Sequence, residues 1–212
     1  MAKCDNHNPT AKLDLRRYFL RKYHADDPPH VLDCCQGGGL MWNQLRREFA
    51  VASYWGVDLK PKKGRLKLDS VRILQQPGWP QNVIDVDTYG SPWKHWEALQ
   101  ANITQPTTVF LTRGSHSTEP LDKSEKKAIG LVFSREIPRA FWPKCQLMDF
   151  AIRHCVTRTC GGIIVIEAVE AVSDGNARYL GVRLEPVKSG GRELVAPARP
   201  STRKLRKEPA HA

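Results

Sequence analysis

Residues 30–39 read HVLDCCQGGG, in which a short apolar segment ends at Asp33 and is followed by three glycines at 37–39. Residues 40–49 then have the pattern of a helix. Glycine adopts positive φ and lets the chain pass close to a ligand, while the first turn of a helix presents free N–H groups. A strand, a glycine-rich turn and a helix in this order predict a ligand-binding loop at the carboxyl end of a strand. A plain tight turn would also explain the glycines, so the spacing of other residues is needed to distinguish a ligand-binding loop from a turn.

Further apolar segments follow this loop and alternate with predicted helices. Strands are expected over residues 53–58, 65–68, 82–87 and 107–112, and helices over 70–76 and 92–99. Residues 163–166 and 179–184 are expected to form a closing antiparallel pair. Strands that alternate with helices predict a wound α/β sheet with parallel strands.

The chain divides into three expected regions. Residues 1–27 contain a basic helix, which the Asp-Asp-Pro-Pro segment at 26–29 ends. Residues 28–185 form the sheet domain. Residues 186–212 are expected to be a flexible basic tail, because glycine, proline and charge replace apolar residues there, and this tail either binds nucleic acid or only keeps the chain soluble. The helix offers cations at Arg16, Arg17, Arg21 and Lys22, which either contact phosphates or form a solvated face.

Charge and composition limit the partners of the protein. Thirty-three Lys and Arg against 22 Asp and Glu give a net charge of +11, which favours polyanions and nucleic acid first. No membrane partner is expected, because no apolar run approaches the roughly 20 residues of a span. The start of the chain lacks the apolar core of a signal peptide, which predicts a cytoplasmic location. The six cysteines have no zinc-knuckle spacing, so no metal site is expected.

Acidic residues follow the predicted strands one after another. Asp58 lies 25 residues after Asp33, at the end of a strand. A carboxylate there can accept hydrogen bonds from both hydroxyls of a ribose. Asp69 follows the next strand, where a side chain can meet an adenine amino group, and Asp87 ends the fourth, beside the expected reaction centre. A single strand-end aspartate is usually a helix cap or a turn residue. Four on successive strands favour a nucleoside pocket instead.

A dinucleotide site is the main alternative for this pocket. Gly37 and Gly39 match the first two glycines of G-x-G-x-x-G, but Trp42 occupies the third position. That glycine permits close packing of helix and strand, which a tryptophan would block. No Gly-Lys-Ser/Thr follows the loop, which argues against a P-loop. The pattern favours one adenosine with a short amino-acid arm.

At this point residues 28–185 resemble class I S-adenosylmethionine (SAM)-dependent methyltransferases. Residues 31–39, VLDCCQGGG, look like their first motif, (D/E)-x-G-x-G-x-G, with Cys35 in place of the first glycine. The resemblance implies a Rossmann-like α/β fold with a mostly parallel, seven-stranded sheet and helices on both faces. It also implies SAM as the cofactor. The residues expected to bind it are Asp33, Gln36, Gly37, Gly39, Asp58, Asp69 and Asp87.

Residues 83–92, VIDVDTYGSP, give the most specific resemblance. They are similar to the D-P-(F/Y)-G-S-P motif of tRNA guanine dimethyltransferases, and more loosely to the (D/N/S)-P-P-(Y/F) motif of amino-methylating DNA enzymes. Thr88 stands where those families carry proline, and the aromatic position favours RNA over DNA. The resemblance implies Asp87 and Tyr89 as catalytic residues. The expected substrate-binding residues are Thr88, Gly90, Ser91, Pro92, Trp93 and Lys94.

These residues suit methyl transfer to an exocyclic amine of a base. Such an amine is a poor nucleophile because its lone pair is delocalised into the ring. Asp87 can accept its hydrogens and aim the lone pair, and Tyr89 can stack on the base. Two other functions stay open, both permitted by the sequence. One is a nucleic-acid-binding module that keeps the fold without turnover, and the other is a methyltransferase for protein or small molecules.

Overall fold

A computed structural model describes residues 9–61, 66–88, 90–113, 163–171, 177–186 and 202–205. The helices are α1 (Pro9–Tyr23), α2 (Leu40–Glu48), α3 (Ser70–Leu74) and α4 (Trp93–Gln100). The strands are β1 (His30–Asp33), β2 (Ser53–Asp58), β3 (Leu66–Lys67), β4 (Val83–Val86), β5 (Thr107–Arg113), β6 (Ile163–Ala171), β7 (Arg178–Pro186) and β8 (Thr202–Leu205). Within these ranges, no helix has both the length and the apolar character that a membrane crossing requires.

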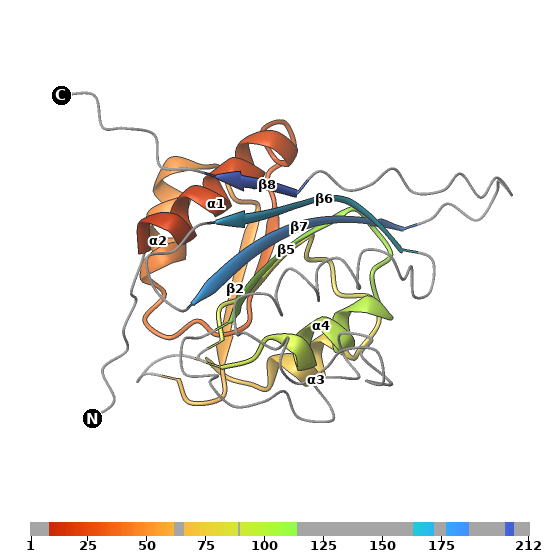
Figure 1. Ribbon diagram of the computed structural model, residues 1–212. Coiled ribbons are helices and arrows are strands. Elements are labelled where there is room, and N and C mark those ends of the chain that lie inside the picture. The colour runs from red at the N-terminus through yellow and green to blue at the C-terminus, as the bar shows by residue number, and fades with distance from the viewer. Residues whose placement is uncertain are drawn as a thin grey trace, which may run out of the picture.

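The described strands form one sheet in the order β3-β2-β1-β4-β5-β7-β6-β8 (Figure 1). The first five strands of that order pair in parallel, as the alternation of strands and helices predicts. β7 is antiparallel to both β5 and β6, which confirms the predicted closing pair. The sheet is therefore mixed, a correction to the expected mostly parallel sheet.

An eighth strand adds to the expected seven. β8 pairs in parallel with β6 and lies within the segment predicted to be a flexible tail. Its four residues, TRKL, carry two charges and no β-branched residue beyond Thr202, so the sequence contains little strand signal. Pairing with the edge of β6 supplies the hydrogen bonds that this short segment needs.

The central strands are buried along their whole length because helices cover both faces of the sheet. All four residues of β4 and all seven of β5 are buried. Strands that are buried on both faces show continuous burial and not alternation. This confirms the predicted arrangement of helices on both faces.

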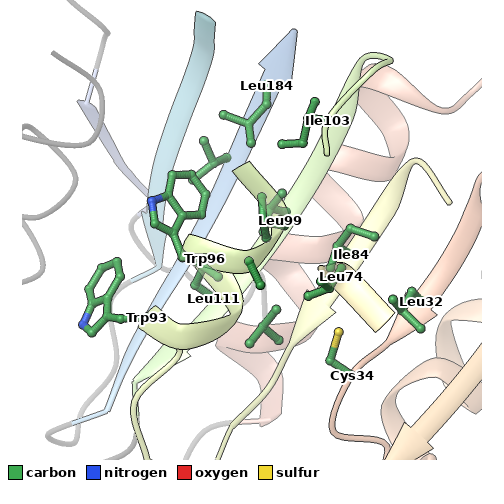
Figure 2. Close-up of a cluster of buried hydrophobic side chains, with 14 of the residues drawn as sticks. Leu32, Cys34, Leu74, Ile84, Trp93, Trp96, Leu99, Ile103, Leu111 and Leu184 are labelled. Atoms are coloured by element: carbon green, nitrogen blue, oxygen red, sulfur yellow. The ribbon is translucent and has the colours of Figure 1, made fainter. Parts of the chain in front are cut away.

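The core has two parts, one on each face. α3 and α4 cover one face and pack Leu74, Trp93, Trp96 and Leu99 against the strands (Figure 2). α1 and α2 cover the other face, where Phe19 of α1 lies edge-on to Phe110 of β5. The helix predicted at the N-terminus is therefore part of the sheet domain and not an appendage to it.

Candidate active site

β1 and β4 are neighbours at the centre of the sheet, and the chain leaves them toward opposite faces. α2, which follows β1, packs on the face of α1, while α4, which follows β4, packs on the other face. In open α/β sheets a crevice forms at such a switch point, outside the carboxyl ends of the strands. Most of the predicted site residues follow β1, β2 and β4 and lie at this edge.

The glycine bend after β1 contacts the acid at the end of β2. Gly37 and Gly39 have φ of 51° and 66°, a region that only glycine adopts readily. The Gly37 N–H donates to Asp58 Oδ2 at 3.0 Å, and the Lys60 N–H donates to Oδ1 at 2.8 Å. Asp58 thus lies directly at the bend, as a nucleoside pocket requires.

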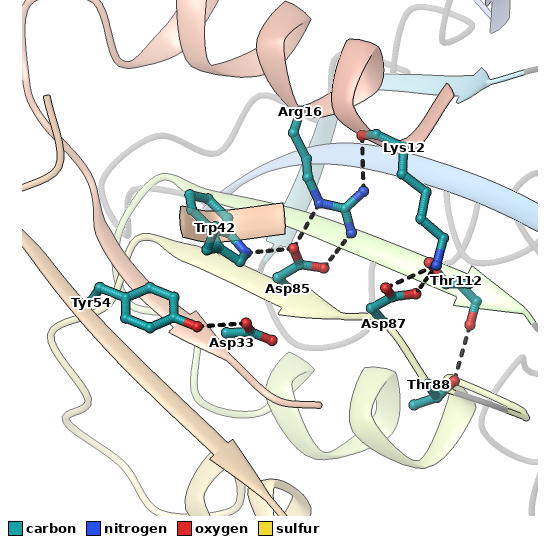
Figure 3. Close-up of polar contacts among 9 residues, drawn as sticks. All are labelled: Lys12, Arg16, Asp33, Trp42, Tyr54, Asp85, Asp87, Thr88 and Thr112. Atoms are coloured by element: carbon teal, nitrogen blue, oxygen red, sulfur yellow. Dashed lines mark hydrogen bonds and ion pairs between the residues drawn. The ribbon is translucent and has the colours of Figure 1, made fainter. Parts of the chain in front are cut away.

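Asp33, the last residue of β1, belongs to a part-buried hydrogen-bonded chain that includes Tyr54 (Figure 3). Tyr54 Oη donates to Asp33 Oδ2 at 2.7 Å, and Gln36 Nε2 donates to Tyr54 Oη at 3.1 Å. Burial raises the pKa of Asp33, and the nearby charge of Asp85 raises it further. Gly56 makes room for this chain, because a Cβ there would collide with the Gln36 side chain.

Asp85 is the most enclosed carboxylate of the site (Figure 3). Arg16 of α1 binds it with two hydrogen bonds, from Nε at 2.7 Å and Nη2 at 2.6 Å. Trp42 Nε1 of α2 donates to Oδ2 at 2.7 Å. Trp42, at the sequence position of the third fingerprint glycine, is therefore buried and hydrogen-bonded, which argues against the dinucleotide pattern.

Asp87 follows β4 and pairs with Lys12 of α1. Lys12 Nζ lies 2.7 Å from Oδ1 and 2.9 Å from Oδ2. The Lys12 side chain is 7% exposed and the Asp87 side chain 20%. Of this pair, the carboxylate is the more accessible group.

The turn after Asp87 is tied to the neighbouring strand. Thr88 Oγ1 donates to the carbonyl of Thr112 in β5 at 3.0 Å (Figure 3). This bond restrains the turn at the position where the similar motifs carry proline. Gly90, Ser91 and Pro92 continue toward α4, while Tyr89 lies outside the described residues.

Several predicted contacts have other partners. Asp69 caps α3 by accepting the Val71 N–H at 3.0 Å, which is the helix-cap alternative weighed for strand-end acids. Trp93 is 2% exposed and belongs to the core, so the expectation that it contacts substrate is wrong, whereas Lys94 is exposed. Trp93 begins α4 and belongs to the same buried hydrophobic cluster as Trp96 of that helix.

The basic face predicted on α1 also needs correction. Arg16 is buried against Asp85, Arg17 binds Glu48 of α2, and Lys22 binds Glu167 of β6. These three cations hold α1 to its neighbours. Of the four cations predicted there, Arg21 alone is exposed without a hydrogen bond or ion pair among the described contacts, and it lies over the Phe49 ring.

Sequence reasoning missed the residues that support the carboxylates. Lys12, Arg16, Trp42, Tyr54 and Asp85 were not predicted to belong to the site. One signal was available: Asp85 sits inside an apolar strand, and a buried carboxylate needs a cationic or hydrogen-bonding partner. The spacing of four residues between Lys12 and Arg16 places both on one face of a helix.

The comparison with solved structures identifies the fold. Trm1 from Pyrococcus horikoshii in complex with S-adenosyl-L-methionine aligns with a TM-score of 0.58 at 18% identity, over 88% of this chain and 59% of that one. The plantazolicin methyltransferase BamL, in complex with a triazolic desmethylPZN analog and SAH, aligns with a TM-score of 0.52 at 12% identity, over 85% of this chain and 87% of that one. This is the fold of the SAM-dependent methyltransferases.

A third methyltransferase-fold structure agrees with these two. The Escherichia coli protein yhhF, which is named as a methyltransferase, aligns with a TM-score of 0.50 at 14% identity, over 85% of this chain and 89% of that one. No protein-family model matches the sequence, and no curated protein matches it either. At these identities the similarity establishes the methyltransferase fold alone. The chain spans 59% of the length of Trm1, so the activity of that protein carries over only as a proposal.

Proposed function

We propose that the protein is a SAM-dependent methyltransferase that modifies an exocyclic amine of a nucleic-acid base, in RNA before DNA. One observation carries the proposal. The Gly37 N–H contacts Asp58 Oδ2 at 3.0 Å, which brings the proposed ribose-binding acid to the glycine bend at the switch point of a methyltransferase fold. A nucleoside cofactor needs that juxtaposition.

The residues present fit the adenosyl part of SAM. An ionised carboxylate offers about four acceptor positions, and the N–H groups of Gly37 and Lys60 use two of those on Asp58. The remaining positions can accept ribose hydroxyls. Gly37 and Gly39 have no side chains that would crowd a ligand at the bend. SAM, when bound, supplies a methyl group activated by a sulfonium.

Asp87 is the group proposed to act on the acceptor amine. As a carboxylate it accepts hydrogen bonds and donates none, so it can hold the N–H groups of the amine and direct the nitrogen lone pair. It is partly exposed at the same sheet edge as Asp58. Tyr89 is proposed to stack on the base, and Gly90, Ser91 and Lys94 to contact the substrate. Alignment and fixed charges would then supply the rate acceleration, without an enzyme nucleophile.

Charge and motif together support a nucleic-acid substrate. The net charge of +11 favours a polyanion, and residues 87–92, DTYGSP, resemble the motif of tRNA guanine dimethyltransferases. Arg16, Arg17 and Lys22 of α1 are paired with acids, so these three cations do not form a phosphate-binding face. The surplus in residues 188–212, seven Lys and Arg against two Glu, is proposed to supply affinity.

One observation favours a second candidate, a nucleic-acid-binding module without turnover. Cys35 and Thr88 stand where the similar motifs carry glycine and proline, so both motifs on which the proposed chemistry depends depart from the family pattern. A module of this kind would bind RNA and transfer no methyl group. An assay of methyl transfer separates the two candidates.

The experiment is labelled methyl transfer from SAM to total tRNA, ribosomal RNA and DNA, followed by nucleoside mass spectrometry. Asp58→Ala should abolish both the thermal stabilisation by S-adenosylhomocysteine and the transfer. Asp87→Ala should lower transfer at least about 100-fold, the usual size of a proton-accepting contribution, and should keep most of that stabilisation, because Asp58 and the glycine bend remain to hold the adenosyl part. Asp14→Ala is the matched control, because Asp14 lies on the exposed side of α1.

The outcomes are distinct. No transfer by the wild type to any nucleic acid, with RNA binding retained, would favour the binding module. Unchanged transfer by Asp87→Ala would remove the proposed chemistry. Stabilisation by NAD instead of S-adenosylhomocysteine would restore the dinucleotide alternative.

A further inference from the structure

Three carboxylates meet at the carboxyl ends of β1 and β4. Asp33 ends β1, Asp85 lies within β4, and Asp87 directly follows it. Two cations face them, Lys12 and Arg16, one turn apart on α1 (Figure 3). The cations come from a helix that sequence reasoning placed outside the catalytic domain.

The two ion pairs differ in how far their side chains are exposed to solvent. Arg16 and Asp85 are each 1% exposed, so that pair is sealed inside the protein. In the other pair the Lys12 side chain is 7% exposed, while that of Asp87 is 20% exposed. The Lys12 ammonium is thus buried, while the Asp87 carboxylate that it binds is more accessible. This arrangement leaves Asp87 able to contact a substrate.

Lys12 is itself held in place. Arg16 Nη1 donates to the backbone carbonyl of Lys12 at 3.0 Å, and Asp85 fixes Arg16 through two hydrogen bonds. The Lys12 ammonium also lies 5.2 Å from the ring centroid of Tyr179 in β7. A lysine loses much rotamer freedom and hydration on burial, so the surrounding contacts must fix this geometry.

We infer that Lys12 is a positioning residue for the proposed methyl transfer, because it holds the Asp87 carboxylate in one orientation and balances its charge against the neighbouring acids. The inference rests on the proposed function. Its physical basis is that Lys12 contacts both oxygens of Asp87, at 2.7 and 2.9 Å, which restricts rotation of the carboxylate. The ionised form is the one that accepts the hydrogens of an amine.

The surroundings of Asp87 explain why a balancing cation is needed. Asp33 and Cys35 lie close enough on the β1 side for the charge of Asp87 to oppose their ionisation. Asp85 of β4 is another nearby carboxylate. Arg16 of α1 forms its ion pair with Asp85, so its positive charge balances Asp85 more than Asp87. Without Lys12, an ionised Asp87 would face these acids with no hydrogen-bonded cation of its own among the described contacts.

The test is methyl transfer by Lys12→Met, measured from pH 5 to 9 with the nucleic acid that the wild type methylates. We expect transfer near neutral pH to fall at least about 10-fold, mainly in kcat, with little change in the KM for SAM. The acid limb of the pH profile should move upward by about one unit or more, the usual effect of a close opposite charge. Thermal stabilisation by S-adenosylhomocysteine should be retained, because Asp58 and the glycine bend are untouched.

Two further variants separate positioning from folding. Lys12→Arg keeps the charge and should restore the acid limb and part of the rate. Lys22→Met makes the same substitution on the same helix and breaks a surface ion pair with Glu167, and it should behave as the wild type. If Lys12→Met does not fold, Lys12→Gln takes its place with the same expected profile.

Each result has one interpretation. A wild-type pH profile for Lys12→Met or Lys12→Gln overturns this inference and leaves the proposed function standing. A shifted profile that Lys12→Arg does not restore also overturns it. If the wild type transfers no methyl group, the proposed function is contradicted, and the inference that rests on it is contradicted as well.

Discussion

Arg16 and Asp85 are fully buried, and each would be an isolated charge without the other. Arg16→Met should lower the free energy of unfolding by about 3–5 kcal/mol, because it leaves Asp85 buried with only the Trp42 N–H as a hydrogen-bond donor among the described contacts. Urea unfolding followed by circular dichroism measures this change. The double variant Arg16→Met/Asp85→Leu should recover part of the loss, since no unpaired charge remains.

The neighbouring residue supplies the control for this prediction. Arg17 also makes a two-pronged contact, to Glu48 of α2 at 2.7 Å from both nitrogens, but near the surface. Exposed pairs contribute little because water and salt screen them. Arg17→Met should therefore cost only a small fraction of the loss seen for Arg16→Met. Equal losses for the two variants would contradict the role given to burial.

At the scale of single residues, the sequence predicted strand-end acids better than their partners. Asp58 and Asp87 could be found because Asp58 ends one apolar strand and Asp87 directly follows another. Lys12 and Arg16 could not be found in the same way, because a cation on an amphipathic helix is normally solvated. Only the position of Asp85 in three dimensions shows that the helix face carrying them is the inner one. Trp93 was misplaced because an aromatic beside a basic residue fits both a binding surface and a helix that faces the core.

Histidines connect secondary-structure elements of the sheet domain. His95 of α4 hydrogen-bonds Ser70 of α3 at 2.8 Å, and His24, just after α1, hydrogen-bonds Thr108 of β5 at 3.0 Å. Burial lowers the pKa of His95 to about 4. Burial also lowers the pKa of His24 to about 4, with a smaller contribution from the charge of Arg183. Both side chains are therefore neutral in the folded protein at pH 6.

Stability should fall as the pH drops from 6.5 toward 4. In that window the unfolded chain binds a proton at each histidine and the folded protein does not, so acidification favours the unfolded state. Each histidine should contribute on the order of 2 kcal/mol over the window. Urea midpoints measured at several pH values should show a flatter dependence for His24→Asn and for His95→Asn. His30→Asn, at an exposed position, is the control, and an unchanged slope in both buried variants would refute the assignment.

At the scale of elements, the strands that follow the glycine bend were predicted closely. Residues 53–58 were expected as a strand and form β2 with the same bounds, and residues 107–112 fall within β5. Their apolar runs are bounded by turn residues, which fixes both ends. β8 could not be predicted, because a short polar strand at a sheet edge depends on its partner and not on its own composition.

Gly181 shows a similar dependence on a distant partner. A Cβ at this position of β7 would collide with the ring of Phe19 in α1. The glycine thus allows the helix to pack closely on the sheet. No feature of the local sequence around residue 181 indicates that a helix from the start of the chain lies over it.

At the scale of the whole molecule, paired cations on the described α1 contrast with a concentration of positive charge in the sequence at the end of the chain. The cations of α1 are largely paired with acids, whereas residues 187–212 hold seven Lys and Arg and two Glu. A large part of the net charge of +11 therefore comes from residues 187–212. Apart from β8, that end lies outside the described residues.

Two truncations test whether that charge binds RNA. A chain that stops at Pro186 loses β8 and exposes the edge of β6, whereas one that stops at Leu205 keeps β8 and loses Arg206 and Lys207. Affinity for labelled tRNA, measured between 50 and 200 mM salt by fluorescence anisotropy, should weaken in both. The slope of log K against log salt should become shallower by about 0.7–0.9 for each phosphate that the shortened protein no longer neutralises, so the longer truncation should have the larger effect.

The same two chains separate charge from architecture. Only the chain that stops at Pro186 should unfold at lower urea and aggregate more readily, because an unpaired strand edge offers its backbone groups to other chains. The chain that stops at Leu205 should match the full-length protein in stability while its salt dependence changes. If both truncated chains keep the salt slope of the full-length protein, the end of the chain does not bind phosphates. The affinity must then come from basic residues elsewhere, such as the exposed Lys94.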